Sequence, residues 1–330
     1  MNRPITLATG QWGDLPLEEL CELTGSLGFD GLEIAVSESV LSIEKAASSK
    51  EYCEERLEIL HSHGLKMWAI CAALAGQCVG DLYDPRLDNF APARFAGKPE
   101  EIRKWAIDFM MQVPTACNNL GVSIVTGFLG SPIWKFFYSF PQTTEEMIEE
   151  GYDRIVSLWT PILDEFQRKN VKFAFEVHPT EIAFDYYSTQ RLLKKMNGHP
   201  AFGLNFDPSH LIWQGVNPTV FLQDFAPYVF HVHMKDASVS YDGRRGILGS
   251  HLPFGSTKRA WNFRSLGHGD VNFEEIIREL NAMQYTGPLS IEWEDNGMDR
   301  IFGLKEAISF VRRINFPPSE IEFDAAIKTD

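Results

Sequence analysis

Charged and imidazole side chains interrupt four apolar segments in the second half of the chain. The segments read VKFAFEVHP, GLNFDPSH, VFHVHMKD and LSIEWED, and they carry Glu176, Asp207, His233 and Glu292. A charged group inside an apolar strand is costly unless it is paired or binds a metal. Three carboxylates and one imidazole form an oxygen-rich ligand set, which suits Mn²⁺, Mg²⁺ or Co²⁺ rather than a thiolate zinc site. These residues therefore predict one divalent-metal site.

Each of these residues also has a purely structural interpretation. A glutamate at a strand end can be a solvated rim residue or the partner of an arginine, and Asp207, which precedes Pro208, can begin a turn. His231 can face away from the interior or be a hydrogen-bonded core histidine. Glu294 competes with Glu292 because alternate side chains of a strand point to one side. Four such residues on four successive strands favour the metal site.

Short apolar runs alternate with long amphipathic stretches along the whole chain, and these elements must position the four residues. The predicted strands cover residues 5–8, 32–35, 66–73, 123–128, 171–177, 203–206, 229–234 and 289–293. The predicted helices cover residues 15–27, 52–63, 99–120, 143–169, 187–196, 219–225, 272–283 and 303–313. Eight strands, each followed by a helix, predict an α/β fold of the (β/α)8 TIM barrel type, in which catalytic groups lie at the C-terminal strand ends.

One domain is expected over residues 1–330, with a polar tail on the surface from about residue 317. An open, doubly wound sheet is the alternative. No Gly-x-Gly-x-x-Gly follows the first strand, which argues against a dinucleotide-binding sheet of that type.

The composition limits the partners of this domain. The 330 residues are 44% hydrophobic and 23% charged, and the formal net charge of −15 disfavours binding to nucleic acid. None of the five cysteines belongs to a CxxC pair, so we expect free thiols and a cytoplasmic protein. The N-terminus carries no apolar stretch of secretory length, and no segment approaches the ~18 apolar residues of a membrane span. A small molecule is therefore the expected partner.

The residues at the strand ends match a known pattern. The set FEVHP, NFDPSH, HVHMKD and IEWED resembles the xylose-isomerase-like barrel superfamily of sugar isomerases and epimerases. The resemblance covers nearly the whole chain and includes ATGQW, GFDGLEI and GHGDVNF. It implies that Glu176, Asp207, His233 and Glu292 hold one divalent metal, with Mn²⁺ favoured over Mg²⁺, Co²⁺ and Zn²⁺. It also implies that His210 contacts the substrate.

A second motif resembles a narrower branch. The segment GFLGSPIWKFFY is similar to enzymes that act on 3-keto-glycosides, including the larger subunit of bacterial C-glycoside deglycosidases. In that branch a histidine acting as base follows the tryptophan, whereas this chain has Lys135 after Trp134. A desolvated lysine can also serve as a base. The resemblance further implies a homo-oligomer and allows a small accessory subunit.

The resemblance implies a metal-dependent isomerase or epimerase of a ketose or keto-sugar, working through an enediolate-like intermediate. The metal would polarise a carbonyl, and Glu176 or Glu292 would move the proton from the neighbouring carbon. The expected substrate contacts are His210, His178, Lys235, Trp134 and Arg264.

Three other functions stay open. The first is a lyase that cleaves C- or O-linked 3-keto-glycosides by β-elimination, with Lys135 or a carboxylate as base. Apurinic endonucleases share the barrel, but they need three zinc ions and a basic groove, and the net charge argues against them. The last is a sugar-binding barrel without catalysis. Whether GHGDVNF shapes a loop or contributes to the site is also open.

Overall fold

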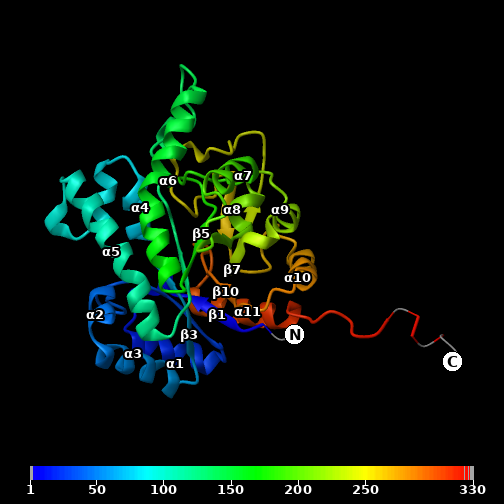
Figure 1. Cartoon of the computed structure of the whole chain (residues 1–330). Coiled ribbons are helices and arrows are strands. Elements are labelled where there is room, and N and C mark those ends of the chain that lie inside the picture. The colour runs from blue at the N-terminus through cyan, green and yellow to red at the C-terminus, as the bar shows by residue number, and fades with distance from the viewer. Residues whose placement is uncertain (1–2, 323, 326, 328–330) are drawn as a thin grey trace.

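Eight parallel strands close into a barrel in the computed structural model, which describes residues 3–322, 324–325 and 327 (Figure 1). Around the barrel the order is β1-β10-β7-β6-β5-β4-β3-β2. The strands are β1 (Ile5–Ala8), β2 (Gly31–Ala35), β3 (Lys66–Cys71), β4 (Ile124–Gly127), β5 (Lys172–Glu176), β6 (Phe202–Phe206), β7 (Val229–Met234) and β10 (Leu289–Ile291). The predicted single-domain (β/α)8 barrel is therefore confirmed.

Helices surround the barrel (Figure 1). They are α1 (Leu17–Leu27), α2 (Ile43–Ser48), α3 (Lys50–Ser62), α4 (Ala73–Gly80), α5 (Pro99–Leu120), α6 (Glu145–Arg168), α7 (Tyr186–Lys195), α8 (Pro208–Ile212), α9 (Pro218–Phe225), α10 (Phe273–Ala282) and α11 (Arg300–Ile314). Each predicted helix overlaps one of these, whereas α2, α4 and α8 were not predicted. Local signals explain several ends: Gly28 and Gly121 follow α1 and α5 with positive φ, and Thr144 caps α6 by accepting from the backbone N–H of Met147.

The core lies between the strands and the helices, and one tryptophan shows how it holds the loops. Trp159 of α6 is fully buried, and its ring centroid lies 4.8 Å from that of Phe173 in β5. Its indole Nε1–H donates to the backbone oxygen of Leu129, at 3.0 Å. The helix is thereby joined to the loop after β4.

An antiparallel hairpin, β8 (Asp236–Val239) and β9 (Trp261–Arg264), follows β7 and was not predicted. Asp236 is buried and accepts hydrogen bonds from the backbone N–H groups of Gly267, Gly269, Val271 and Ala237. The GHGDVNF loop is therefore bound to the hairpin, and its glycines let the backbone approach: a Cβ at position 269 would lie 2.2 Å from Asp236 Oδ1.

Two irregularities in strand register alter which side chains face the barrel interior. The pairing of β2 with β3 shifts between Leu32 and Glu33, and the pairing of β6 with β7 shifts between Leu204 and Asn205. Such bulges bend a strand and re-aim its side chains. Both Glu33 and Asn205 are fully buried and belong to the candidate site described below.

Residues 317–322 are exposed and form neither helix nor strand, and this segment extends away from the barrel (Figure 1). Among the described helices, none combines the length and apolar character that a membrane span requires.

Candidate metal centre

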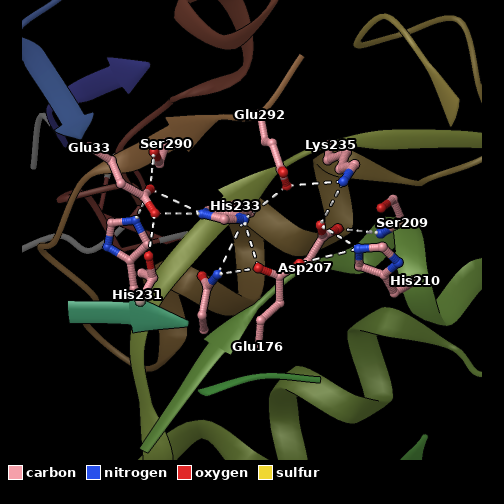
Figure 2. Close-up of polar contacts among 12 residues, drawn as sticks. Glu33, Glu176, Asp207, Ser209, His210, His231, His233, Lys235, Ser290 and Glu292 are labelled. Atoms are coloured by element: carbon pink, nitrogen blue, oxygen red, sulfur yellow. Dashed lines mark hydrogen bonds and ion pairs between the residues drawn. The ribbon is translucent and has the colours of Figure 1, made fainter. Parts of the chain in front are cut away.

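The four predicted ligands come together at the C-terminal end of the barrel. Glu176 ends β5, Asp207 directly follows β6, His233 lies in β7, and Glu292 directly follows β10. One ligand atom from each lies within 4.8 Å of the others. Two ligands on opposite sides of an ion at about 2.1 Å would lie about 4.2 Å apart, so one ion can contact all four with small adjustments. The side chains are drawn in Figure 2.

Asp207 combines a structural role with an unsatisfied oxygen. Its Oδ1 accepts from the backbone N–H of Ser209 at 2.8 Å and so caps α8, which agrees with the turn-starting interpretation. Its Oδ2 is buried without a hydrogen-bond partner among the described residues. The nearest basic groups are His210 Nε2 at 3.4 Å and Lys235 Nζ at 3.9 Å. The cap thus fixes the carboxylate with one oxygen free for a cation.

His233 connects the cluster to the barrel interior. Its Nδ1 lies 3.1 Å from Glu292 Oε2 and 3.5 Å from Glu176 Oε2, while its Nε2 faces Glu33. Asn205 Nδ2 donates to Glu176 Oε2 at 3.2 Å, which holds that glutamate beside the imidazole. One ring nitrogen, Nδ1, therefore faces the cluster, and the other, Nε2, faces the buried carboxylate of Glu33.

Glu292 and Glu294 both lie beside Lys235, but only the carboxylate of Glu292 approaches the other candidate ligands. Lys235 Nζ lies 3.1 Å from Glu292 Oε2 and 3.0 Å from Glu294 Oε2, and 4.3 Å from the Phe263 ring centroid. Glu294 accepts a hydrogen bond from Gln11 Nε2 instead of approaching His233. Among the two glutamates, Glu292 is the one whose carboxylate lies with the other three candidate ligands.

Glu33 of β2 contacts the cluster through His233, and the sequence reasoning did not single it out. Its fully buried carboxylate accepts from His231 Nε2 at 2.9 Å, His233 Nε2 at 3.0 Å, Ser290 Oγ at 2.7 Å and Thr126 Oγ1 at 2.5 Å. His231 thus faces the interior as a hydrogen-bonded core histidine. The signal was present, because Glu33 is a charged residue in the apolar segment GLEI.

Glu33, His231 and His233 could also be considered as metal ligands. However, two hydroxyls and two imidazole nitrogens already surround the Glu33 carboxylate at hydrogen-bond distance. Burial would raise its pKa, but His233 and His231 lower the pKa well below the ordinary value. An ionised carboxylate surrounded by donors is satisfied without a cation.

The charge balance of the four-residue cluster fits a divalent cation. Burial raises the pKa of Glu176 to about 7, and repulsion from Glu292 adds to the shift. Burial likewise raises the pKa of Asp207 to about 6. Burial would raise the pKa of Glu292 too, but Lys235 and His233 lower it below the ordinary value. The three carboxylates lie close together, with Glu176 and Asp207 buried and Glu292 partly exposed, so an added cation would stabilise their ionised forms.

His210 and His178, the two predicted substrate-binding histidines, lie at the edge of this cluster. His210 Nε2 is 3.2 Å from Glu176 Oε1, and its ring centroid is 4.2 Å from that of His178. Burial lowers the pKa of His210 to about 4 and lowers that of His178 well below the ordinary value. Both rings are therefore neutral near pH 7 and can donate or accept one hydrogen bond at each nitrogen. His210 Nε2 and His178 Nδ1 are buried without hydrogen-bond partners in the described part of the chain.

The remaining predicted residues lie further out. Trp134 stacks on Phe137 at 4.9 Å and meets the edge of Phe184 at 5.1 Å. Lys135 is exposed, so it is not the desolvated lysine that a base would require, and its charge acts on Asp81 and Asp84.

Arg264 ends the hairpin strand β9. Its Nη1 lies 3.6 Å from Asp295 Oδ1, and its side chain is 35% exposed. The structure therefore joins Lys235, His210 and His178 to the cluster, whereas no described contact joins Trp134, Lys135 or Arg264 to it.

The fold is a closed (β/α)8 barrel, and a carboxylate–imidazole cluster lies at the C-terminal ends of its strands. The xylose isomerase-like TIM barrel family matches residues 21–314, and the chain belongs to this family. Proteins similar to this chain are named as epimerases and dehydratases.

Two relatives illustrate the range. The uncharacterized protein YfiH of Bacillus subtilis is 23% identical over 329 residues, which cover 94% of this chain and 98% of the relative. The inosose dehydratase of Clostridium beijerinckii is 24% identical over 174 residues, covering 52% of this chain and 54% of the relative. The match to the dehydratase thus spans about half of each protein.

Solved structures share the fold. The 3-keto-D-glucoside 4-epimerase YcjR from E. coli has a TM-score of 0.66 at 14% identity, covering 94% of this chain and 99% of that chain. A xylose isomerase-like barrel from Mycobacterium smegmatis in complex with magnesium has a TM-score of 0.64 at 18% identity, covering 95% of this chain and 96% of that chain. The IOLI protein with a bound zinc atom has a TM-score of 0.64 at 16% identity, covering 94% of this chain and 98% of that chain. At these identities the likeness shows the fold alone.

Proposed function

We propose that this protein is a divalent-metal-dependent isomerase or epimerase of a ketose or keto-sugar. The observation that carries the proposal is the convergence of Glu176, Asp207, His233 and Glu292 within 4.8 Å at the C-terminal end of the barrel. The same four residues would hold one metal ion, and Mn²⁺ is our first candidate because three of the ligands are carboxylates. When bound, the ion would polarise a substrate carbonyl and acidify the neighbouring C–H.

The chain's own residues would carry the proton. Glu176 is buried in the cluster with its Oε1 3.2 Å from His210 Nε2, and its carboxylate is proposed to accept the proton from carbon. Glu292 lies on the other side of His233 Nδ1 and would return a proton to the carbon. If it does so from the opposite face, the product is an epimer. Removal and return of one proton leave the composition of the sugar unchanged.

Lys235 and His210 would orient the sugar. Lys235 holds Glu292 and Glu294 and is itself packed over Phe263 of the hairpin, so its ammonium has a fixed position. The neutral His210 lies within 3.2 Å of Glu176 and can hydrogen-bond a substrate hydroxyl beside the proton-accepting oxygen. The stacked ring of Trp134 is proposed as a platform at the rim.

β-Elimination is the second candidate, because several similar proteins are named as dehydratases. It uses the same first step. After the proton leaves carbon, the electron pair expels a β-hydroxyl or an aglycone instead of being reprotonated.

Incubation in D₂O with Mn²⁺ separates the two candidates. Free ketoses and 3-keto-glucosides would be followed by ¹H NMR. A new stereoisomer with one deuterium supports the epimerase, whereas an unsaturated product or released aglycone supports elimination. Glu176→Gln should abolish either reaction. Survival of activity in that variant, or failure of the wild type to bind any divalent metal, would contradict the proposal.

A further inference from the structure

Glu33 is not one of the four candidate ligands, yet its carboxylate accepts hydrogen bonds from four side chains next to the cluster. It is fully buried in the barrel and lies on the far side of His233 from Glu176 and Glu292 (Figure 2). A buried carboxylate of this kind needs a reason, because burial of a charge is costly unless the charge is paired.

The hydrogen-bond pattern around Glu33 dictates how His233 carries its proton. Both Glu33 oxygens lie 3.0–3.1 Å from His233 Nε2. An ionised carboxylate only accepts hydrogen bonds, so Nε2 must carry a proton. The other nitrogen, Nδ1, points towards Glu292 at 3.1 Å and Glu176 at 3.5 Å. In a neutral imidazole with Nε2–H, the Nδ1 lone pair therefore faces the cluster.

Three further side chains prevent Glu33 from turning away. His231 Nε2 and Ser290 Oγ donate to Oε2 at 2.9 and 2.7 Å, and Thr126 Oγ1 donates to Oε1 at 2.5 Å. They come from β7, β10 and β4, while Glu33 comes from β2. The carboxylate is therefore fixed by strands on several sides of the barrel, and the ring of His233 is fixed through it.

We propose that Glu33 is a positioning residue, which selects the Nε2–H tautomer of His233 and directs Nδ1 to the metal centre. The proposal rests on the proposed function, because it assigns His233 as a metal ligand. Carboxylate partners of ligating histidines raise ligand basicity, and their loss costs about 10- to 100-fold in metal affinity. Glu33 thus contributes to metal binding without touching the metal or the substrate.

The test compares Glu33→Gln with Glu181→Gln in the full chain. Glu181 is also buried, but it binds the backbone of the loop after β4, so the same substitution there is a matched control. Titration calorimetry with Zn²⁺ should show about 10- to 100-fold weaker binding for Glu33→Gln and little change for Glu181→Gln. Circular dichroism would establish that each variant is folded. Equal affinities of wild type and folded Glu33→Gln would overturn the proposal.

A second measurement does not depend on any variant. In ¹⁵N-histidine-labelled wild type loaded with Zn²⁺, long-range ¹H–¹⁵N spectra should show His233 protonated at Nε2 and ligated through Nδ1. The opposite arrangement would overturn the positioning role while leaving the proposed function intact. If the wild type binds no divalent metal at all, both the proposed function and the role of Glu33 are wrong.

Discussion

A second buried carboxylate, Glu181, holds the loop that leads from β4 to Trp134. Its Oε2 accepts from the backbone N–H groups of Leu129 and Gly130 at 2.9 and 2.6 Å, and the residue is 1% exposed. Burial, with repulsion from Asp81, raises the pKa of Glu181 to about 8. Replacement by glutamine removes this titration and keeps the size of the side chain. We expect Glu181→Gln to change how the stability of the protein depends on pH.

The magnitude follows from the difference between the folded and unfolded pKa values. The folded value is about 8 and the ordinary value is 4.5, so the folded protein binds the proton more tightly than the unfolded chain does. Stability from this group is therefore fully present below pH 4.5 and is lost as the pH rises through 8. Linkage at about 1.36 kcal/mol per unit gives a loss of about 3 kcal/mol between pH 5.5 and 8.5. About 1 kcal/mol of it falls above pH 7, where Asp81, with a pKa of about 6, is already ionised.

Urea unfolding of wild type and Glu181→Gln at pH 5.5, 7.0 and 8.5 measures this difference. The free energy of unfolding of the wild type should fall relative to the variant by about 3 kcal/mol across the range. Glu100→Gln is the control, because the Glu100 side chain is 88% exposed. Parallel pH profiles for wild type and Glu181→Gln would refute the reasoning, since they would mean that Glu181 titrates alike in both states.

Further expectations concern the metal centre and the core. Glu292→Gln should weaken Mn²⁺ binding by at least about tenfold and Glu294→Gln by less, because only Glu292 lies with the other ligands; calorimetry giving equal losses would contradict the assignment. Saturation with Mn²⁺ at 100 times its Kd should raise the free energy of unfolding by about 2.7 kcal/mol over the chelator-treated protein, and coincident urea curves would argue against a resident metal. Lys135→Met should exchange the substrate proton in D₂O at a rate within about threefold of the wild-type rate, because Lys135 is exposed. A loss of about 100-fold would indicate that Lys135 is the base. Trp159→Phe should lower stability by about 2 kcal/mol in urea unfolding, since a buried ring portion and a hydrogen bond to Leu129 are lost, and a change below about 0.5 kcal/mol would contradict that account.

The barrel and the ligand candidates were accessible from sequence because each leaves a local mark. Strand β7 is apolar apart from His231 and His233, and β5 is apolar between the exposed Lys172 and Glu176, so inward polar residues stand out against the pattern. The choice of Glu292 over Glu294 depended on the family resemblance, because strand alternation alone places both residues on the same side. Only the three-dimensional structure shows that Gln11 binds Glu294 while Glu292 approaches His233.

The features that sequence did not reveal depend on contacts between distant segments. The hairpin β8–β9 was hidden because its two strands are separated by 21 residues, from 240 to 260. The loop role of GHGDVNF depends on Asp236, whose four backbone partners cannot be inferred from spacing. Ser290 and Thr126 carry no charge to mark them, so their bonds to Glu33 left no signal.

The bulges explain how a barrel of apolar strands can hold so many polar groups at one end. In the pairing of β6 with β7, Leu204 lies opposite Val229 and Asn205 lies opposite His231, so Phe230 has no partner in β6. This extra residue shifts the register of β7 against β6 before the two histidines, so that His231 lies opposite Asn205, and His231 and His233, two residues apart, share the inward side. A matching shift on the other side of the barrel accompanies Glu33 of β2. The imidazole of His233 lies between the Glu33 carboxylate and the four-residue cluster, so the geometry of the candidate metal centre depends on strands at opposite sides of the barrel. For this reason we expect substitutions in β2, which contains none of the proposed ligands, to affect metal binding as strongly as substitutions close to the ligands themselves.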